Sequence, residues 1–277
     1  MYLDHFGLVE WPFGITPDTS FTYAGQAHQE ALNTLLLALG TGEGFIKITG
    51  EVGTGKTLLC RRLLLTLDEN WVTAYLPSPM LGARALFLAL AEELGLGDLE
   101  GLNHYQLIQR ISQLLVEHAR QGKHVAFCID EAQTMPIQTL EALRLLSNME
   151  TEKSKLLQIV LFGQPELDEK LRQPEIRQLL QRITFHYRLS ALRPDETSAY
   201  VAHRLRIAGY RGERLFSSPA LRALHRASSG TPRLINILAH KALLLVFGEG
   251  LQTIRRRHIR LASRDTEGAR RVGWLWG

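Results

Sequence analysis

The sequence predicts an α/β protein: a three-layer domain with a five-stranded parallel sheet, followed by a small all-helical domain. Three observations support this class. Short apolar runs of strand length alternate with longer amphipathic segments from residue 45 to about 190, which is typical of a parallel sheet covered on both faces. Beyond Leu189 no further runs of strand length occur. The 277 residues are enough for about two domains.

The expected elements follow one another in a regular order. Strands are expected at 45–49, 72–76, 125–129, 157–162 and 184–189, with helices at 56–67, 83–94, 105–121 and 137–149. Pro136 and Asn148 flank the last of these helices as boundary residues should. Later helices begin at Pro194, Ser217 and Thr231. We therefore expect an N-terminal extension (1–41), an α/β core (42–192), a helical domain (193–264) and a basic, aromatic tail (265–277).

A phosphate-binding motif follows the first expected strand. Residues 50–57 read Gly-Glu-Val-Gly-Thr-Gly-Lys-Thr, the pattern G-x-x-x-x-G-K-[ST] of a P-loop between a strand and a helix. Glycines let the chain curl tightly, so that several backbone N–H groups point at the phosphates. The positive N-terminal end of the following helix lies at the same place. Lys56 would meet the β- and γ-phosphates, and the Thr57 hydroxyl would ligate Mg²⁺. The alternative is a glycine-rich turn without a ligand. The expected nucleotide-binding residues are Gly50, Glu51, Val52, Gly53, Thr54, Gly55, Lys56, Thr57 and Leu58.

Two acidic residues follow the third expected strand. Asp130 and Glu131 come directly after the apolar run 125–129, at the end of a parallel strand where ligands bind. Asp130 is expected to hold Mg²⁺ from the second coordination sphere of the ion, and Glu131 is the expected polariser of the attacking water. The alternative is that the pair begins a solvated turn before Pro136. Together with the P-loop, the pair predicts hydrolysis of a nucleoside triphosphate.

Composition limits the remaining possibilities. The first residues lack a basic-then-apolar signal segment, and no apolar run approaches the ~20 residues needed to cross a bilayer. Cys60 and Cys128 follow no metal-ligand spacing and lie in an expected helix and strand. This favours two core thiols in a reducing cytosol over a disulfide.

Positive charge is concentrated near the end of the chain. The formal net charge is +4, and residues 254–271 carry seven arginines against two acids, a balance of +5. The high sequence pI of about 9.2 therefore reflects the arginines of this region, and it does not indicate a nucleic-acid-binding surface over the whole protein. Arg270 and Arg271 precede Trp274 and Trp276, a combination suited to a membrane interface. The alternative is a frayed tail.

The two motifs, the strand–helix order and the helical C-terminal part together resemble the AAA+ ATPases. The likeness spans nearly the whole chain and is similar in detail to the ExeA/GspA group of secretion and pilus-assembly ATPases. Within that group, residues 44–47 and 247–250 resemble the MshM-type biogenesis proteins of mannose-sensitive haemagglutinin (MSHA) type IV pili. The segments that carry the group resemblance are 1–8, 12–13, 16–18, 42–45, 130–133, 161–167 and 230–236.

The resemblance implies further site residues and cofactors. The nucleotide would be ATP with Mg²⁺, and Gln164 occupies the sensor-1 place. Arg233 occupies the sensor-2 place, from which an arginine of the helical lid domain (193–264) reaches the γ-phosphate. A cation at a helix N-terminus opposes the helix dipole, which itself suggests a bound anion, although a plain surface arginine is the alternative. Arg182, or failing that Arg177, would be the arginine finger that enters a neighbouring subunit. Each could instead be an ordinary exposed charge.

These implications lead to one main functional hypothesis and two alternatives. The main hypothesis is a cytoplasmic, Mg-dependent, oligomeric AAA+ ATPase, hexameric by resemblance, that assists assembly of a pilus or secretion apparatus at the inner membrane. It is either soluble or peripheral at the inner face of that membrane. The first alternative is a DNA-associated AAA+ regulator of the transposition type, favoured by the basic tail. The second is a nucleotide-binding scaffold with little hydrolysis. Phe13 and Tyr23 are expected to wall the adenine pocket or to serve the core.

Overall fold

The computed structural model describes residues 2–150 and 155–273, so Trp274 and Trp276 of the expected membrane interface lie outside the described residues. The chain divides into two compact units. We call His28–Glu51 with Leu59–Leu189 the sheet unit. We call the described part of Met1–Ala27, Val52–Leu58 and Ser190–Gly277 the helical unit.

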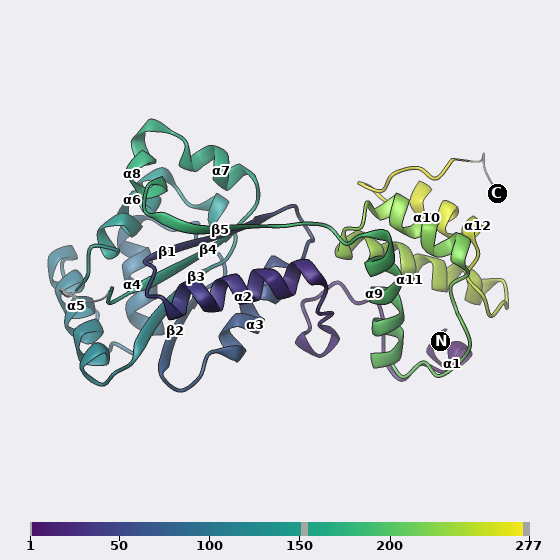
Figure 1. Cartoon of the computed structure of the whole chain (residues 1–277), viewed down its shortest axis with the longest axis horizontal. Helices are drawn as coiled ribbons and strands as arrows, with labels where there is room; N and C mark the ends of the chain where they lie inside the picture. The colour runs from purple at the N-terminus through teal and green to yellow at the C-terminus, as the bar shows by residue number, and fades with distance from the viewer. Residues whose placement is uncertain (1, 151–154, 274–277) are drawn as a thin grey trace. The chain divides into compact units, whose positions relative to one another are not determined.

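A parallel sheet forms the centre of the sheet unit (Figure 1). Its described residues form the strands β1 (Phe45–Gly50), β2 (Trp71–Leu76), β3 (His124–Ile129), β4 (Gln158–Gly163) and β5 (Ile183–Leu189). All pair in parallel in the order β2-β3-β4-β1-β5, which confirms the predicted five-stranded parallel sheet. Because β4 lies between β1 and β3, the carboxyl ends of these three strands meet at one edge of the sheet.

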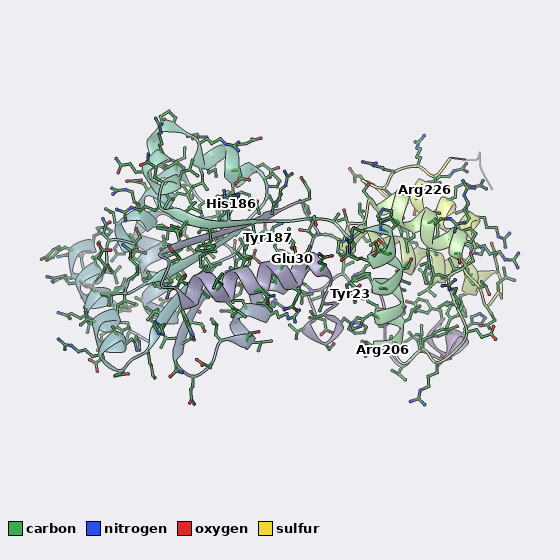
Figure 2. All side chains as sticks on the ribbon, viewed as in Figure 1. Tyr23, Glu30, His186, Tyr187, Arg206 and Arg226 are labelled. Atoms are coloured by element: carbon green, nitrogen blue, oxygen red, sulfur yellow. The ribbon has the colours of Figure 1, made fainter. Side chains whose placement is uncertain are left out.

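Helices cover both faces of this sheet. On one face, side chains such as Phe127 and Leu161 form an apolar core with helices α4, α5 and α6. On the other face, Cys60 of α3 shares a hydrogen bond with Cys128 of β3. There the Tyr187 hydroxyl of β5 also donates to the Glu30 carboxylate of α2, at 2.9 Å (Figure 2). The helices that begin in or cross this unit are α2 (Gln26–Gly40), α3 (Lys56–Thr66), α4 (Ala83–Glu93), α5 (His104–Arg120), α6 (Ile137–Leu146), α7 (Glu166–Leu171) and α8 (Arg177–Leu180).

Both cysteines are free and buried, which confirms the prediction of two core thiols. Although they are far apart in the sequence, they are neighbours in the fold. Their mutual hydrogen bond, followed by burial, raises the pKa of the Cys60 thiol well above its usual value. A buried thiol with a raised pKa is a packing residue rather than a nucleophile.

The helical unit is built from α1 (Tyr2–Phe6), α9 (Pro194–Ile207), α10 (Ser218–Ser228), α11 (Pro232–Gly248) and α12 (Arg256–Arg264). The predicted change from strands to helices after the sheet is therefore confirmed. The described residues of the helical unit also form one isolated β-bridge, between Phe216 and Ile254. Gly230 shows how tightly this unit is packed. A Cβ on Gly230 would lie 2.0 Å from the carbonyl oxygen of Leu192, and its φ is +74°. Only glycine fits at this position.

The N-terminal residues contribute to the core of the helical unit. Phe13 is buried and lies edge-on to Phe216, with 6.0 Å between ring centroids. Tyr23 meets Tyr200 of α9 in the same way at 5.8 Å. These contacts are those of core aromatic residues, and a role in an adenine pocket stays a prediction.

The arginines near the end of the chain lie largely on a folded helix rather than in a loose tail. Helix α12 packs on α10 and α11, and its Ile259 and Ala262, with the preceding Ile254, are buried. Removing residues 254–277 would therefore also remove part of a core. Across residues 2–150 and 155–273, no helix combines the length and apolar character that a membrane span requires.

Candidate active site

The P-loop motif lies between β1 and α3, as the sequence predicts. Strand β1 ends at Gly50 and α3 begins at Lys56. Gly53 and Gly55 have φ angles of +80° and +98°, a conformation that glycine adopts at little cost. A Cβ on Gly53 would lie 2.6 Å from the Cβ of Arg233. Both backbone conformation and close approach therefore require glycine at Gly53, and left-handed glycines of this kind occur in loops that cradle phosphates.

The side chains of the loop divide into buried and exposed groups. Lys56 is only 5% exposed, and Thr54 is buried. A buried ammonium group is stable only with charged or polar partners, which suits a lysine whose ligand is a phosphate. Val52 is exposed, and Glu51 makes an exposed ion pair with Arg188 at 3.8 Å. These two positions can therefore contribute to phosphate binding mainly through their backbone N–H groups.

Asp130 is held in a buried setting directly after β3. Its residue is 2% exposed, and its carboxylate oxygen Oδ1 accepts the backbone N–H of Glu131 at 2.9 Å. The Asp130 carboxylate also affects Tyr75 of the neighbouring β2. Burial, followed by the charge of Asp130, raises the pKa of Tyr75 to about 12. A buried carboxylate supplies the hard oxygen ligand that Mg²⁺ prefers.

Glu131 is fixed by its backbone and by two amide side chains. Its φ and ψ are 51° and 36°, a left-handed conformation that a residue with a side chain seldom adopts. The side-chain oxygen Oε2 accepts hydrogen bonds from Gln133 Nε2 at 2.6 Å and from Gln164 Nε2 at 3.1 Å. The structure thus brings the expected sensor-1 residue, Gln164, into direct contact with the expected water polariser.

Three residues around this carboxylate pair were not assigned from the sequence. Gln133 contacts both Glu131 and Gln164. Lys170 of α7 donates to the main-chain carbonyl oxygens of Gln133 and Met135. Tyr75 lies close to Asp130. Of the three, only Gln133 could have been assigned from the sequence, because it stands in the motif 130–133. Lys170 and Tyr75 come from other parts of the chain.

Arg233 lies against the P-loop within the helical unit. Thr231 is the N-cap of α11 and Pro232 its first residue, so Arg233 lies in the first turn of that helix. The backbone N–H of Arg233 donates to the carbonyl oxygen of Gly53 at 3.2 Å. The side chain of Arg233 is exposed. The expected sensor-2 residue and the glycine loop are therefore neighbours within this unit.

The two candidate arginine fingers have different surroundings. Arg182 is half-buried, and its Nη1 donates to the hydroxyl of Ser147 at 2.6 Å. Arg177 begins α8 and is exposed. Within the described residues, Arg177 has no side-chain partner. The favoured candidate from the sequence, Arg182, is thus engaged inside its own chain, whereas Arg177 is available to another molecule.

The donor groups present are of the chemical kind that binds a nucleotide with a magnesium ion. Thr57 offers a hydroxyl in the first turn of α3, and Asp130 offers a buried carboxylate at the end of β3. Mg²⁺ is usually bound by one or two such oxygen ligands together with substrate phosphates.

Known proteins resemble this chain in both sequence and fold. The AAA domain family model matches residues 39–171. The chain is 42% identical over 278 residues to general secretion pathway protein A of Aeromonas hydrophila, an alignment that covers 100% of this chain and 51% of that protein. The chain thus spans about half the length of that curated relative.

Solved structures show the same fold. The chain superposes on the ORC2 protein of Aeropyrum pernix, solved as ADPNP–ADP complexes, with a TM-score of 0.66 and 15% identity over 91% of this chain and 72% of that one. For Cdc6p from Pyrobaculum aerophilum the TM-score is 0.67, with 19% identity over 90% and 70%. At these identities the likeness shows the AAA-type α/β P-loop fold alone. By its identity to general secretion pathway protein A, its matched AAA domain and this fold, the chain belongs to the ExeA/GspA-like AAA+ ATPases.

Proposed function

We propose that the chain binds Mg·ATP at the P-loop and hydrolyses it with Glu131 as the residue that polarises the attacking water. The setting of the Glu131 carboxylate is the observation that carries this proposal. Two amide groups, from Gln133 and Gln164, donate to the same oxygen atom. A carboxylate held by two donors is oriented before substrate binds, which lowers the entropic cost of reaching the transition state. An acid in a solvated turn would need no such partners.

The other proposed site residues bind the phosphates and the metal ion. Lys56 offsets negative charge on the β- and γ-phosphates, and Asp130 and Thr57 hold Mg²⁺. The ion, when bound with ATP, neutralises charge that develops on the phosphate oxygens. Glu131 accepts hydrogen-bond donation from the attacking water and orients it. Gln164 acts on this step only through its hydrogen bond to Glu131.

Arg233 is proposed to meet the γ-phosphate. Its main-chain contact with Gly53 places the first turn of α11 beside the glycine loop. A cation in the first helical turn opposes the dipole of its own helix. A bound phosphate would convert this unfavourable arrangement into a favourable one, because the phosphate attracts both the guanidinium group and the helix N-terminus.

The enzyme is proposed to work as an oligomer whose sites are completed by an arginine from a neighbouring subunit. The exposure of Arg177 supports this residue as the finger in the structure. The sequence-based preference for Arg182 depended on its nearness to β5, and its hydrogen bond to Ser147 supports a role inside the chain instead. A hexameric ring is proposed from the family resemblance.

In the cell, the ATPase is proposed to drive assembly of a secretion or type IV pilus apparatus, of the MSHA type by resemblance. Its place is the cytoplasm or the inner face of the cytoplasmic membrane. Identity to general secretion pathway protein A supports the secretion role. The resemblance of residues 44–47 and 247–250 supports the pilus role.

A chromosomal Lys56→Ala replacement tests this cellular role. We expect the host to lose surface pili or export of secreted proteins while the variant accumulates to wild-type levels, because hydrolysis rather than folding is removed. Lys123→Ala, at an exposed position, is the matched control and should change neither. Loss of pili with normal export identifies the pilus role, and the reverse identifies secretion. If both processes are normal in the Lys56→Ala strain, the proposed cellular role is wrong.

The salt dependence of DNA binding separates the proposed ATPase role from the DNA-associated alternative. Arg264, Arg270 and Arg271 are exposed, and a basic surface alone gives weak, sequence-independent binding. We expect any binding to duplex DNA to fall steeply between ~50 and ~200 mM salt, and replacing these three arginines with glutamine to reduce the salt slope by roughly 3. Fluorescence anisotropy with two unrelated duplexes measures both quantities.

A matched control uses three exposed basic residues of the sheet unit. Replacing Arg120, Lys123 and Arg172 with glutamine removes the same charge from residues that are also exposed, and should leave the slope nearly unchanged. Substitution is preferable to deletion from residue 254, because α12 is part of a core. Tight binding to one duplex at physiological salt would favour the transposition-type regulator over the secretion ATPase.

A further inference from the structure

We propose that Gln133 is a positioning residue for ATP hydrolysis, which links the Glu131 carboxylate to the main chain at the end of β4. The inference depends on the proposed role of Glu131 and adds a residue to it. Gln133 would contact neither ATP nor the attacking water. Its function would be to hold Glu131 in one orientation and to couple that orientation to the position of Gln164.

Both ends of the Gln133 amide are used. Its Oε1 accepts the backbone N–H of Gln164 at 3.0 Å, and its Nε2 donates to Glu131 Oε2 at 2.6 Å. A backbone N–H can only donate, so the amide oxygen must face Gln164 and the amide nitrogen must face the carboxylate. The orientation of this side chain is therefore determined by the chemistry of its two partners.

The turn that carries Gln133 is itself anchored. Lys170 of α7 donates to the carbonyl oxygens of Gln133 and Met135, the latter at 2.8 Å. The Thr134 backbone N–H and hydroxyl both donate to the carbonyl oxygen of Glu131, each at 2.9 Å. A side chain on such a turn has little freedom to leave its partners, so it can hold another group in place.

The end of β4 leaves room for this contact. A Cβ at Gly163 would lie 3.3 Å from Gln133 Oε1 and 2.7 Å from Leu167 Cδ2. Any larger residue would push against the amide that bridges β3 and β4. Glycine at this position therefore permits the close approach of the two strand ends.

This arrangement leaves one carboxylate oxygen for water. Oε2 of Glu131 accepts from both Gln133 and Gln164, so Oε1 is the atom proposed to receive the attacking water. Without the Gln133 amide, the carboxylate would keep one side-chain donor, and Gln164 would lose its main-chain anchor. Turnover would suffer, whereas ATP binding would not, because Lys56 and the glycine loop remain.

Two substitutions separate positioning from simple bridging. Gln133→Glu keeps an acceptor for the Gln164 N–H but replaces the donor to Glu131 with a repelling carboxylate. Gln133→Ala removes both contacts. We expect both variants to lower kcat roughly tenfold or more, the size of losing a hydrogen bond to a charged group, with KM for ATP within about twofold of wild type. Gln138 is an exposed glutamine in α6, so Gln138→Glu is the matched control and should leave kcat unchanged.

A double substitution decides whether Gln133 acts through Glu131. In the Glu131→Gln background, Gln133→Ala should lower single-turnover hydrolysis by no more than about twofold, because groups that act as a unit are non-additive. An equal fractional loss in both backgrounds, or wild-type kcat in Gln133→Glu, would overturn the inference. If Glu131→Gln itself keeps wild-type turnover, the proposed catalytic role of Glu131 fails first, which is a distinguishable result.

Discussion

Glu131→Gln should leave ATP binding nearly intact and lower turnover by roughly two to four orders of magnitude, the range for losing a positioned base or electrostatic group. The carboxylate acts on the water in the transition state and makes little contact with ATP in the ground state. Glutamine keeps the size of the side chain and an acceptor for Gln133. The loss would therefore report the charge rather than a collapse of the turn.

Lys56→Ala, in contrast, should weaken ATP binding as well as lower turnover. Its ammonium group meets the phosphates in the ground state as well as in the transition state, so affinity falls together with turnover. Titration with a fluorescent ATP analogue and phosphate release measure the two quantities. Glu166→Gln, the same change at an exposed position of α7, is the control for Glu131→Gln. Equal losses of affinity in the Lys56 and Glu131 variants would contradict this division of roles.

Removing the arginine finger should lower the rate of ATP hydrolysis to a similar extent. A finger supplied by a neighbouring subunit can be worth about 10³-fold or more in rate. We expect Arg177→Ala to lose this factor, because Arg177 is exposed at the start of α8. Arg182→Ala is the comparison, and it should lower stability through loss of the Ser147 contact more than it lowers turnover per folded subunit. The reverse outcome would return the finger to Arg182.

Mixing the variants tests completion of the site in trans. An Arg177→Ala subunit keeps an intact P-loop, and a Lys56→Ala subunit keeps an intact finger. Each should be nearly inactive alone, and the mixture should recover part of the activity at mixed interfaces. Specific activity of the wild type should also rise with protein concentration, and light scattering of Glu131→Gln with Mg·ATP should show a ring-sized species. Activity independent of concentration, with no recovery on mixing, would show that one chain contains the whole site.

Local patterns predicted most of the sheet unit because its strands are short, apolar and separated by helical segments. The five expected strands agree with the observed ones within one residue at each end. Helix α2 (Gln26–Gly40) was not assigned, although its buried Ala31, Leu32, Leu35 and Leu39 have helical spacing. Helix α6 ends at Leu146 rather than near residue 149, and the Ser147 hydroxyl there donates to the carbonyl oxygen of Arg144.

The site was predictable where its chemistry is contiguous in the sequence and not where it depends on packing. The P-loop and Asp130-Glu131 each lie in one short motif, so residue types and spacing were sufficient. The contact of Gln133 with the main chain of Gln164 joins residues 31 positions apart. The Arg182–Ser147 contact joins residues 35 positions apart. No periodicity reports such pairs, since only the parallel pairing of β3 with β4 brings the first pair together.

The central claim is that this chain hydrolyses ATP at the P-loop. Phosphate release from ATP with excess Mg²⁺, measured for the wild type and for Lys56→Ala purified in parallel, tests it most directly. The account predicts release that saturates with ATP in the wild type, stops when Mg²⁺ is chelated, and is at background in the variant. Equal release by the two proteins, or none by a folded wild type that binds ATP and assembles, would contradict it.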